Sequence, residues 1–300
     1  MDNTIYDKYR RAGQVAADAR EYGLSLIKEG VRFLDVAEGV EARIREQGCS
    51  FAFPVNISRN DLAAHYSPRH DDQSVFHKGD LVKLDVGVHV DGYIADTAST
   101  IEVGTMTYNS LITASRTALD NAIKKIGGHS SLTEVGKTIQ ETIQSFGFKS
   151  IENLTGHSLE RYVLHSGLSI PNINDPTFIK VKPKVGDVIA VEPFASNGAG
   201  HVISGDGSNI YLFLGSVRGR LVRDQKTRIM LQKIHTSFGT LPFAQRWCVK
   251  NFSEVDSLLK KLSFFGSLKH YPQLKDKNKG MVSQAEHTVI ITEDGCEVIT

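Results

Sequence analysis

The sequence has few of the features that stabilise small secreted proteins or span membranes. Cysteine occurs only at Cys49, Cys248 and Cys296, which are far apart and form no C-x-x-C pair. This spacing argues against a disulfide framework and against a thiolate zinc site. No apolar stretch approaches the length of a membrane-spanning helix, and the N-terminus, charged from its second residue, lacks the pattern of a secretory signal. We therefore expect a cytoplasmic protein without membrane contact.

No charge of one sign dominates the chain either. The 35 Lys and Arg residues nearly balance the 34 Asp and Glu residues, for a formal net charge of +1. No long-range field therefore draws the whole molecule onto nucleic acid or an anionic membrane. With 8 prolines, 26 glycines and 40% hydrophobic residues, the composition is that of an ordinary globular protein. Three hundred residues suffice for one large domain or two smaller ones.

Apolar spacing predicts helices in pairs, separated by short strands. Helical periodicity covers residues 5–26 and 34–46, and again about 108–126 and 132–146. Apolar runs of strand length follow these pairs, at residues 81–90, 93–103, 188–194, 210–214, 288–291 and 297–300. The pattern predicts a mixed α/β (α+β) class with strands arranged in hairpins.

One internal repeat links two of these strands. Residues 79–85, GDLVKLD, match residues 186–192, GDVIAVE, so each is a Gly-Asp turn, an apolar strand and a carboxylate in the same register. A chance match is the simpler explanation, because Gly-Asp commonly precedes a strand. The shared terminal acid favours a duplicated half-domain. Two such halves would present Asp85 and Glu192 to a shared centre.

The turn at Asp91-Gly92 predicts where a second acid lies relative to Asp85. If these two residues form a hairpin loop, Gly87 faces Asp96 and Asp85 faces residue 98. Side chains alternate along a strand, so Asp85 and Asp96 share a face and lie diagonally opposite, about 7 to 8 Å apart. Two inward carboxylates at that separation can bind one cation.

Further acids and histidines extend this candidate site. Glu192 ends the repeated strand, Glu286 precedes the apolar run at 288–291, and His157 and His165 lie eight residues apart beside small residues. Each taken alone is more simply a solvent-exposed or structural residue. Oxygen ligands with one imidazole suit manganese, iron, cobalt or zinc. Several carboxylates around one or two such ions generate a bridging hydroxide that can hydrolyse an amide.

Together these residues resemble a known ligand set. Asp85, Asp96, His157 in NLTGHSL, Glu192 in VEPF and Glu286 in SQAEHTV are similar, in order and spacing, to the five metal ligands of methionine aminopeptidase. The run FPVNIS at 53–58, before AAHY at 63–66, resembles the type 2, archaeal-like branch of that family. The resemblance extends from the first predicted helix to the C-terminus. It implies the pseudo-symmetric pita-bread fold and removal of the N-terminal methionine from nascent proteins and peptides.

The resemblance also implies roles for these residues around two divalent ions, whether cobalt, manganese, iron or zinc. Asp85 would chelate one ion, Asp96 and Glu286 would bridge both, and His157 and Glu192 would complete the other around a shared hydroxide. Glu192 would also act as general base and acid. His165 would hydrogen-bond the scissile carbonyl. His65 would contact the peptide nitrogen, and it is the residue that fumagillin-like epoxides attack in this family.

The implied specificity requires a narrow apolar pocket for the methionine side chain. By analogy its walls are Phe53, Pro54, Leu164 and Phe194, with His201 as a further candidate, although ordinary core packing explains each one equally well. The free α-amine would be held by metal or by the acidic ligands. Internal peptide bonds would therefore be excluded.

A change of charge marks a separate segment. Residues 216–279 hold 14 Lys and Arg against four acids, about +10, whereas the remainder carries about −9. Spaced apolar residues predict a small helical subdomain there. Type 2 enzymes carry a helical, winged-helix-like insert at this position. We therefore divide the chain into a catalytic pita-bread domain, residues 1–215 and 280–300, and a basic helical insert, residues 216–279.

The insert offers a second surface for binding. Nascent chains emerge at an RNA-rich ribosome, and clustered Lys and Arg, among them Arg218, Arg220, Arg223 and Arg228, would contact phosphate there. An ordinary solvated helical face is an equally good explanation of the same charges.

Two other functions fit the same fold. An Xaa-Pro aminopeptidase or prolidase would share the five ligands, but such enzymes usually carry a large extra N-terminal domain, and only 84 residues precede Asp85 here. A non-catalytic pita-bread protein that binds RNA or histones would typically lack some of the ligands, and all five are present.

Overall fold

The two N-terminal helices form where the apolar spacing predicts them. In the computed structural model, which describes residues 1–215 and 224–300, they are α1 (Asn3–Leu26) and α2 (Phe33–Glu46). The Asp2 side chain caps α1 by accepting a hydrogen bond from the Thr4 amide. Alanines on one face of α1 are fully buried, whereas the Lys and Arg residues between them lie mostly toward solvent. Burial of the apolar face thus fixes both helices.

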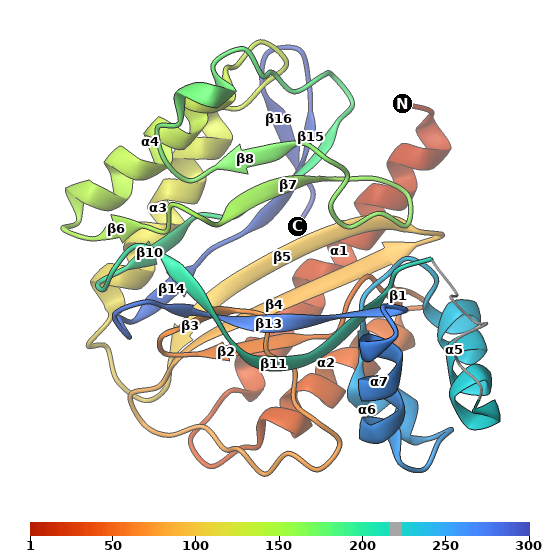
Figure 1. Cartoon of the computed structure of the whole chain (residues 1–300). Coiled ribbons are helices and arrows are strands. Elements are labelled where there is room, and N and C mark those ends of the chain that lie inside the picture. The colour runs from red at the N-terminus through yellow and green to blue at the C-terminus, as the bar shows by residue number, and fades with distance from the viewer. Residues whose placement is uncertain (216–223) are drawn as a thin grey trace.

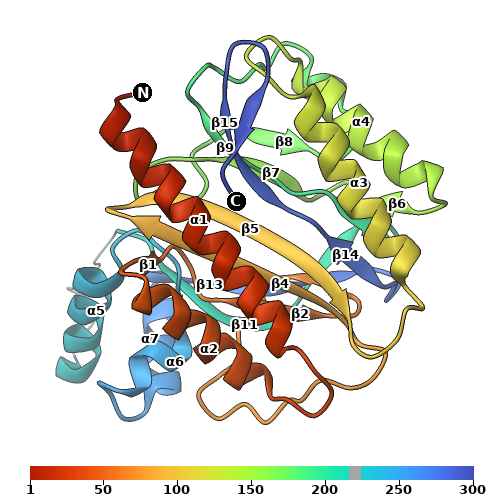
Figure 2. The same ribbon diagram turned by 180° about the vertical axis from the view of Figure 1, so that it is seen from behind.

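The first sheet is built on the predicted hairpin. Strands β4 (Leu81–Val90) and β5 (Tyr93–Glu102) pair in the expected register, with Gly87 opposite Asp96 and Asp85 opposite Ala98. Both turn residues between them have positive φ angles, +51° and +88°, as a tight hairpin loop requires. Strands β1 (Ser50–Phe51) and β2 (Asn56–Arg59) also pair with β4. Helix α1 crosses the outer face of this sheet (Figure 2).

The second half repeats the plan with a helix pair beside a sheet (Figure 1). Helices α3 (Asn109–Lys125) and α4 (Leu132–Ser145) pack against each other, and the 3-10 helix η1 (Pro176–Phe178) follows. The sheet has the order β16-β15-β9-β7-β8. Its strands are β7 (Thr155–Leu159), β8 (Ser169–Pro171), β9 (Val188–Val191), β15 (His287–Ile291) and β16 (Cys296–Val298).

The strand expected over residues 188–194 is broken in two, and this prediction was wrong. Strand β9 ends at Val191, and β10 (Phe194–Ser196) belongs to another small sheet with β6 (Lys149–Ser150) and β14 (Val282–Gln284). Pro193 has no N–H to donate to a continuing ladder. The break leaves Glu192 between the two sheets.

The two Gly-Asp turns of the internal repeat are equivalent in detail. Gly79 and Gly186 have φ angles of +88° and +91°, and their N–H groups donate to a carbonyl at the end of the neighbouring antiparallel segment, at 2.7 and 2.8 Å. The side chains of Asp80 and Asp187 each accept from the N–H three residues earlier, both at 2.8 Å. This match supports a duplicated half-domain.

A cluster of helices lies at one edge of the molecule. Helices α5 (Gln225–Phe238), α6 (Gln245–Val249) and α7 (Val255–Phe264) enclose a small core of their own, which includes Met230, Leu231 and Leu259. Ile229 of α5 does not belong to this core and is 51% exposed. In the described part of the chain, no helix combines the length and apolar character needed to cross a membrane.

This cluster is joined to the rest of the molecule by a sheet of order β12-β11-β13-β3. Its strands are β3 (Leu62–Ala64), β11 (Val202–Phe213), β12 (Phe243–Ala244) and β13 (Leu268–Asp276), so β11 is far longer than the run predicted at 210–214. β13 lies within the range assigned to the insert, yet it pairs with β3 of the N-terminal part. The boundaries of the insert remain a prediction.

Candidate active site

A cavity that contains the predicted ligand residues lies where the two halves of the molecule meet. The edge of β5 is joined to the segment that enters β15 by two backbone hydrogen bonds between Ala98 and Glu286, at 2.9 and 3.4 Å. The Thr288 hydroxyl adds a second link, accepting from the Asp96 amide at 2.8 Å and donating to the Asp96 carbonyl at 2.7 Å. These bonds fix the carboxylates of one half against those of the other.

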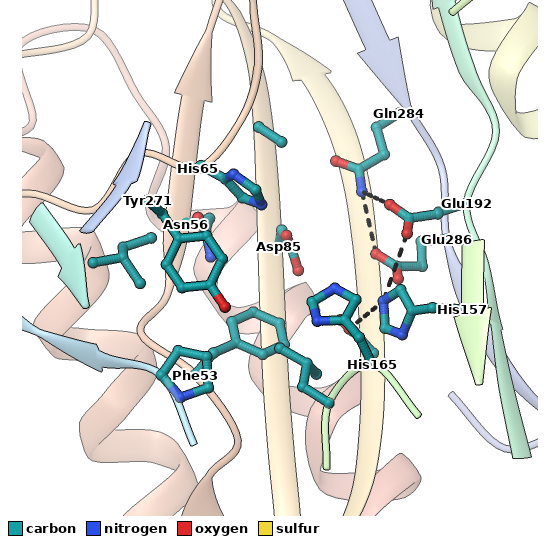
Figure 3. Close-up of a pocket in the computed structure, with 15 residues that line it drawn as sticks. Phe53, Asn56, His65, Asp85, His157, His165, Glu192, Tyr271, Gln284 and Glu286 are labelled. Carbon is teal, nitrogen blue, oxygen red and sulfur yellow. Dashed lines mark hydrogen bonds and ion pairs between the residues drawn. The ribbon is translucent and has the colours of Figure 1, made fainter. Parts of the chain in front are cut away.

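All five residues of the predicted ligand set line this one cavity. Figure 3 shows Asp85, His157, Glu192 and Glu286 among the lining residues. They come from different elements: Asp85 from β4, Asp96 from β5, His157 from β7, Glu192 from the break after β9, and Glu286 from the approach to β15. His157 Nε2 lies 3.7 Å from Asp96 Oδ2 and 3.6 Å from Glu192 Oε1. Potential ligand atoms of Asp96, His157 and Glu286 all lie within 4.8 Å of one another. The structure therefore brings together in one cavity the five residues that the family resemblance named.

Burial makes this cluster electrostatically unfavourable. It raises the pKa of Asp85 to about 7, and it raises the pKa values of Asp96, Glu192 and Glu286 well above their ordinary range. Charge repulsion among the four acids adds to the effect for the last three. Among the described residues that line the cavity there is no Lys or Arg. The described lining residues therefore supply no cation to this cluster, and the charge of Arg20 opposes the rise in the pKa of Glu286 without cancelling it.

Several polar atoms of the cluster have no hydrogen-bond partner. Buried Oδ1 atoms of Asp85 and Asp96 and the buried Nδ1 atom of His157 are without one. The Gln284 amide donates to Glu286 Oε2 at 3.2 Å and, at 3.5 Å, to Glu192 Oε2. Unpaired buried carboxylates are costly unless they hold a cation. The donor set therefore fits hard or borderline divalent ions.

Two further histidines flank the cluster. His65 follows β3 with a φ angle of +64°, and its ring lies 5.3 Å from that of Tyr271. The His165 ring lies 4.2 Å from that of His157. Burial lowers the pKa of His65 to about 4 and that of His157 to about 3, and it also lowers the pKa of His165. All three imidazoles are therefore neutral at pH 7.

Only some of the expected pocket-wall residues line the cavity in the structure. Phe53 and Leu164 line the cavity, and Gly87 leaves the space for Phe53, because a Cβ there would lie 2.1 Å from the ring. Pro54 and Phe194 are buried but are not among the described residues that line it; Phe194 belongs to a separate apolar cluster. His201 lies outside it as well, with Nδ1 2.9 Å from Glu152.

Six other residues, which were not predicted from the sequence, also line the cavity: Asn56, Ala64, Ile210, Pro242, Tyr271 and Gln284. Three had a usable signal. Asn56 lies in the FPVNIS run and pairs with Asp85, Ala64 lies in the AAHY run, and Gln284 stands two positions before Glu286. Ile210, Pro242 and Tyr271 belong to no motif and come from strands and loops around the helical cluster.

Comparison with known proteins identifies the family. Residues 7–293 match metallopeptidase family M24. The chain is 47% identical, over its full length and that of the relative, to "Methionine aminopeptidase" from Methanocaldococcus jannaschii. The chain belongs to metallopeptidase family M24, among its methionine aminopeptidases. It is thus a metallo-exopeptidase, and Asp96, His157 and Glu286 form a candidate group for the metal of this family.

Solved structures match the whole chain as well. A methionine aminopeptidase from Thermotoga maritima superposes with a TM-score of 0.72 at 24% identity, covering all of this chain and 98% of the other. A structure described as a thermophilic Arx1 gives 0.87 at 18% identity, covering all of this chain and 91% of the other. At these identities the matches establish the shared pita-bread fold, as predicted.

Proposed function

We propose that this chain removes the N-terminal methionine from nascent proteins and peptides in the cytoplasm, with two divalent ions. The observation that carries the proposal is the cavity itself: the carboxylates of Asp85 and Glu192, half-buried, and of Asp96 and Glu286, buried, converge with a neutral imidazole beside apolar side chains, and the described lining holds no Lys or Arg. The three free cysteines are consistent with a reducing compartment.

Asp85, Asp96, His157, Glu192 and Glu286 would hold the ions. When bound, such ions act as Lewis acids and make a nucleophile available from water at neutral pH. Glu192 would take the proton of the attacking water and return it to the leaving amine. The chain's remaining contribution is to orient the substrate.

His165 and His65 orient the peptide bond. As a neutral imidazole, each has one N–H donor and one acceptor nitrogen. The N–H of His165 donates to the carbonyl oxygen as negative charge develops on it. His65, whose buried Nδ1 has no partner, contacts the peptide nitrogen. We expect His65→Ala to lose most turnover but to keep its metal.

The methionine side chain occupies the apolar part of the cavity. Phe53 and Leu164 form its walls together with Ile210 and Pro242. The acidic cluster next to them attracts the free α-amine. This arrangement confines cleavage to the first peptide bond.

The test compares two substrates on metal-stripped protein titrated separately with manganese, cobalt, iron and zinc. Metal-dependent release of methionine from a Met-Ala-Ser peptide is the expected result. Cleavage of an Xaa-Pro dipeptide alone would instead indicate the prolidase-like alternative, which identity to methionine aminopeptidases does not favour. No cleavage with any metal would overturn the proposal.

We further propose a ribosome contact through the basic helical segment. Its support is the excess of Lys and Arg over residues 216–279, including the solvent-exposed Lys226 and Lys261. Arg218, Arg220 and Arg223 lie outside the described residues. The enzyme should co-sediment with ribosomes at low salt and be released at high salt. Co-sedimentation unaffected by neutralising these three residues and Arg228 would contradict the proposal.

A further inference from the structure

Leu164 and His165 enter the cavity from the loop between β7 and β8, and contacts outside the cavity hold this loop in place. We propose that Tyr162 is a positioning residue for the reaction. Its backbone and ring rest on the Asp91-Gly92 turn, and Thr240 braces its carbonyl, so the segment that presents Leu164 and His165 is fixed. The inference rests on the roles proposed above for those two residues.

Tyr162 packs against the hairpin turn between β4 and β5. The Tyr162 N–H donates to the Gly92 carbonyl at 2.8 Å. A Cβ on Gly92 would lie 2.4 Å from two atoms of the Tyr162 ring, so the ring occupies space that only glycine leaves free. His89 contributes to this packing, because its ring lies 5.5 Å from the Tyr162 ring and its Nδ1 accepts the Gly92 N–H at 3.1 Å. The turn therefore also serves as a docking point for the loop.

The loop is tightly bent at this residue. Tyr162 has a φ angle of +59°, a left-handed conformation that non-glycine residues adopt only when their surroundings hold them. Glu160 and Val163 exchange two backbone hydrogen bonds around it, both 3.0 Å long. This bend directs the chain back toward the cavity, and Leu164 and His165 follow at once.

Contacts on either side restrain the same segment. The Thr240 hydroxyl, just beyond α5, donates to the Tyr162 carbonyl at 2.5 Å, and Pro242 two residues later lines the cavity. On the other side of His165, Ser166 donates its N–H to the Ser158 carbonyl at 2.9 Å and its hydroxyl to the Ser158 hydroxyl at 2.7 Å. The two cavity residues are thus clamped between Tyr162 and β7. Through Thr240 and Pro242, the segment that follows α5 thus contributes to the shape of the site.

Tyr162 differs from a core residue, because its side chain is 41% exposed and lies outside the apolar clusters of the described residues. Its removal should cost little packing but should free the loop. Displacement of a reacting group by about 1 Å can lower a rate by about 100-fold. Metal binding should be preserved, since the five ligands lie outside the segment 160–167.

The experiment measures kcat and KM on a Met-Ala-Ser peptide, manganese affinity by calorimetry, and Tm for Tyr162→Ala, Tyr162→Phe and Thr240→Val. Tyr22→Ala is the matched control, because Tyr22 is 39% exposed and is not among the described cavity residues. We expect Tyr162→Ala to lower kcat/KM at least tenfold with manganese affinity within about threefold of wild type. Tyr162→Phe, which keeps the ring, should recover most of the loss, and Thr240→Val should lie between them. Tyr22→Ala should match wild type.

Wild-type kcat/KM in Tyr162→Ala would overturn the inference. So would equal losses in Tyr162→Ala and Tyr162→Phe, or a loss that follows manganese affinity. If Tyr162→Ala does not fold, Thr240→Val alone decides, and wild-type kcat/KM in that variant counts against the inference. His165→Ala separates the two proposals: full turnover there, with a loss in Tyr162→Ala, would refute the role of His165 and leave Leu164 as the group that Tyr162 positions.

Discussion

Two sets of buried carboxylates in this molecule have opposite surroundings. Asp276, at the end of β13, is 1% exposed and accepts hydrogen bonds from the Ser196 hydroxyl and from four backbone N–H groups, those of residues 199, 200, 278 and 280. Asp96 is 4% exposed, and its Oδ1 has no partner. These hydrogen bonds lower the pKa of Asp276 despite its burial, whereas burial and neighbouring acids raise the pKa of Asp96.

The difference separates a structural acid from one that we propose to be a metal ligand. Donors supplied by the chain make the ionised form of Asp276 part of the folded structure. The cavity acids receive few donors and depend on a cation from outside. A buried acid that the chain itself does not satisfy is therefore the better indicator of a site.

The largest effect should follow from removing one cavity acid. Asp96→Asn keeps the shape of the side chain but removes a charge that the cation requires. We expect peptide hydrolysis at saturating manganese to fall by roughly 10³-fold, equivalent to about 4 kcal/mol. The control is Asp120→Asn, an exposed position on α3, which should keep wild-type rates. Full activity in Asp96→Asn would show that this acid is not a ligand.

A third buried acid, Glu41 of α2, is satisfied by a cation from the chain. It pairs with Arg246 of α6, and Trp247 Nε1 donates to it at 3.0 Å. Glu41→Ala would leave Arg246 buried without its carboxylate, so we expect a loss of about 3 kcal/mol in the free energy of unfolding. Urea denaturation measures it, with the exposed Glu38→Ala on the same helix as control. An unchanged unfolding midpoint would mean that the helical cluster docks without this pair.

Asp276→Asn tests the hydrogen-bonded acid. An asparagine amide would turn donors toward backbone N–H groups that need an acceptor. We expect the free energy of unfolding to fall by about 2 kcal/mol while activity per folded molecule is retained. Asp206→Asn, whose side chain is 88% exposed, is the control for loss of a carboxylate. A large loss of activity with unchanged stability would place Asp276 among the functional acids instead.

Local rules were enough to predict the hairpin and its acids. The Asp91-Gly92 turn fixes the register of β4 and β5, and the register decides which side chains share a face. The same rule explains why Asp85 and Asp96 could be paired from the sequence alone. Their convergence with His157, Glu192 and Glu286 could be predicted only from the family resemblance, because no local rule predicts how two sheets pack against each other.

Long-range packing explains what the sequence could not predict. Tyr271 and Ile210 reach the cavity only because β11 and β13 pair across the helical cluster, and neither residue belongs to a motif. Phe194 is adjacent to a motif residue, yet the break at Pro193 directs it into another apolar cluster. Proximity in sequence to a ligand was therefore a weak guide to the pocket walls.

The smallest expected effect is a pH-dependent change in the free energy of unfolding. Because the folded pKa of Asp85 is raised from 3.8 to about 7, its protonated form contributes stability that is complete below about pH 4 and is lost as the pH rises toward 7. Asp85→Asn cannot ionise, and both proteins carry the same histidines, so their difference reports Asp85 together with its charge repulsion on the other three cavity acids. In EDTA, we expect the variant to gain about 1 kcal/mol relative to wild type between about pH 5.5 and 6.5, measured by urea denaturation. Saturating manganese should abolish or reverse the gain, since the bound cation favours the ionised carboxylate. A difference that stays flat with pH in EDTA would mean that Asp85, like Asp276, is satisfied by the chain.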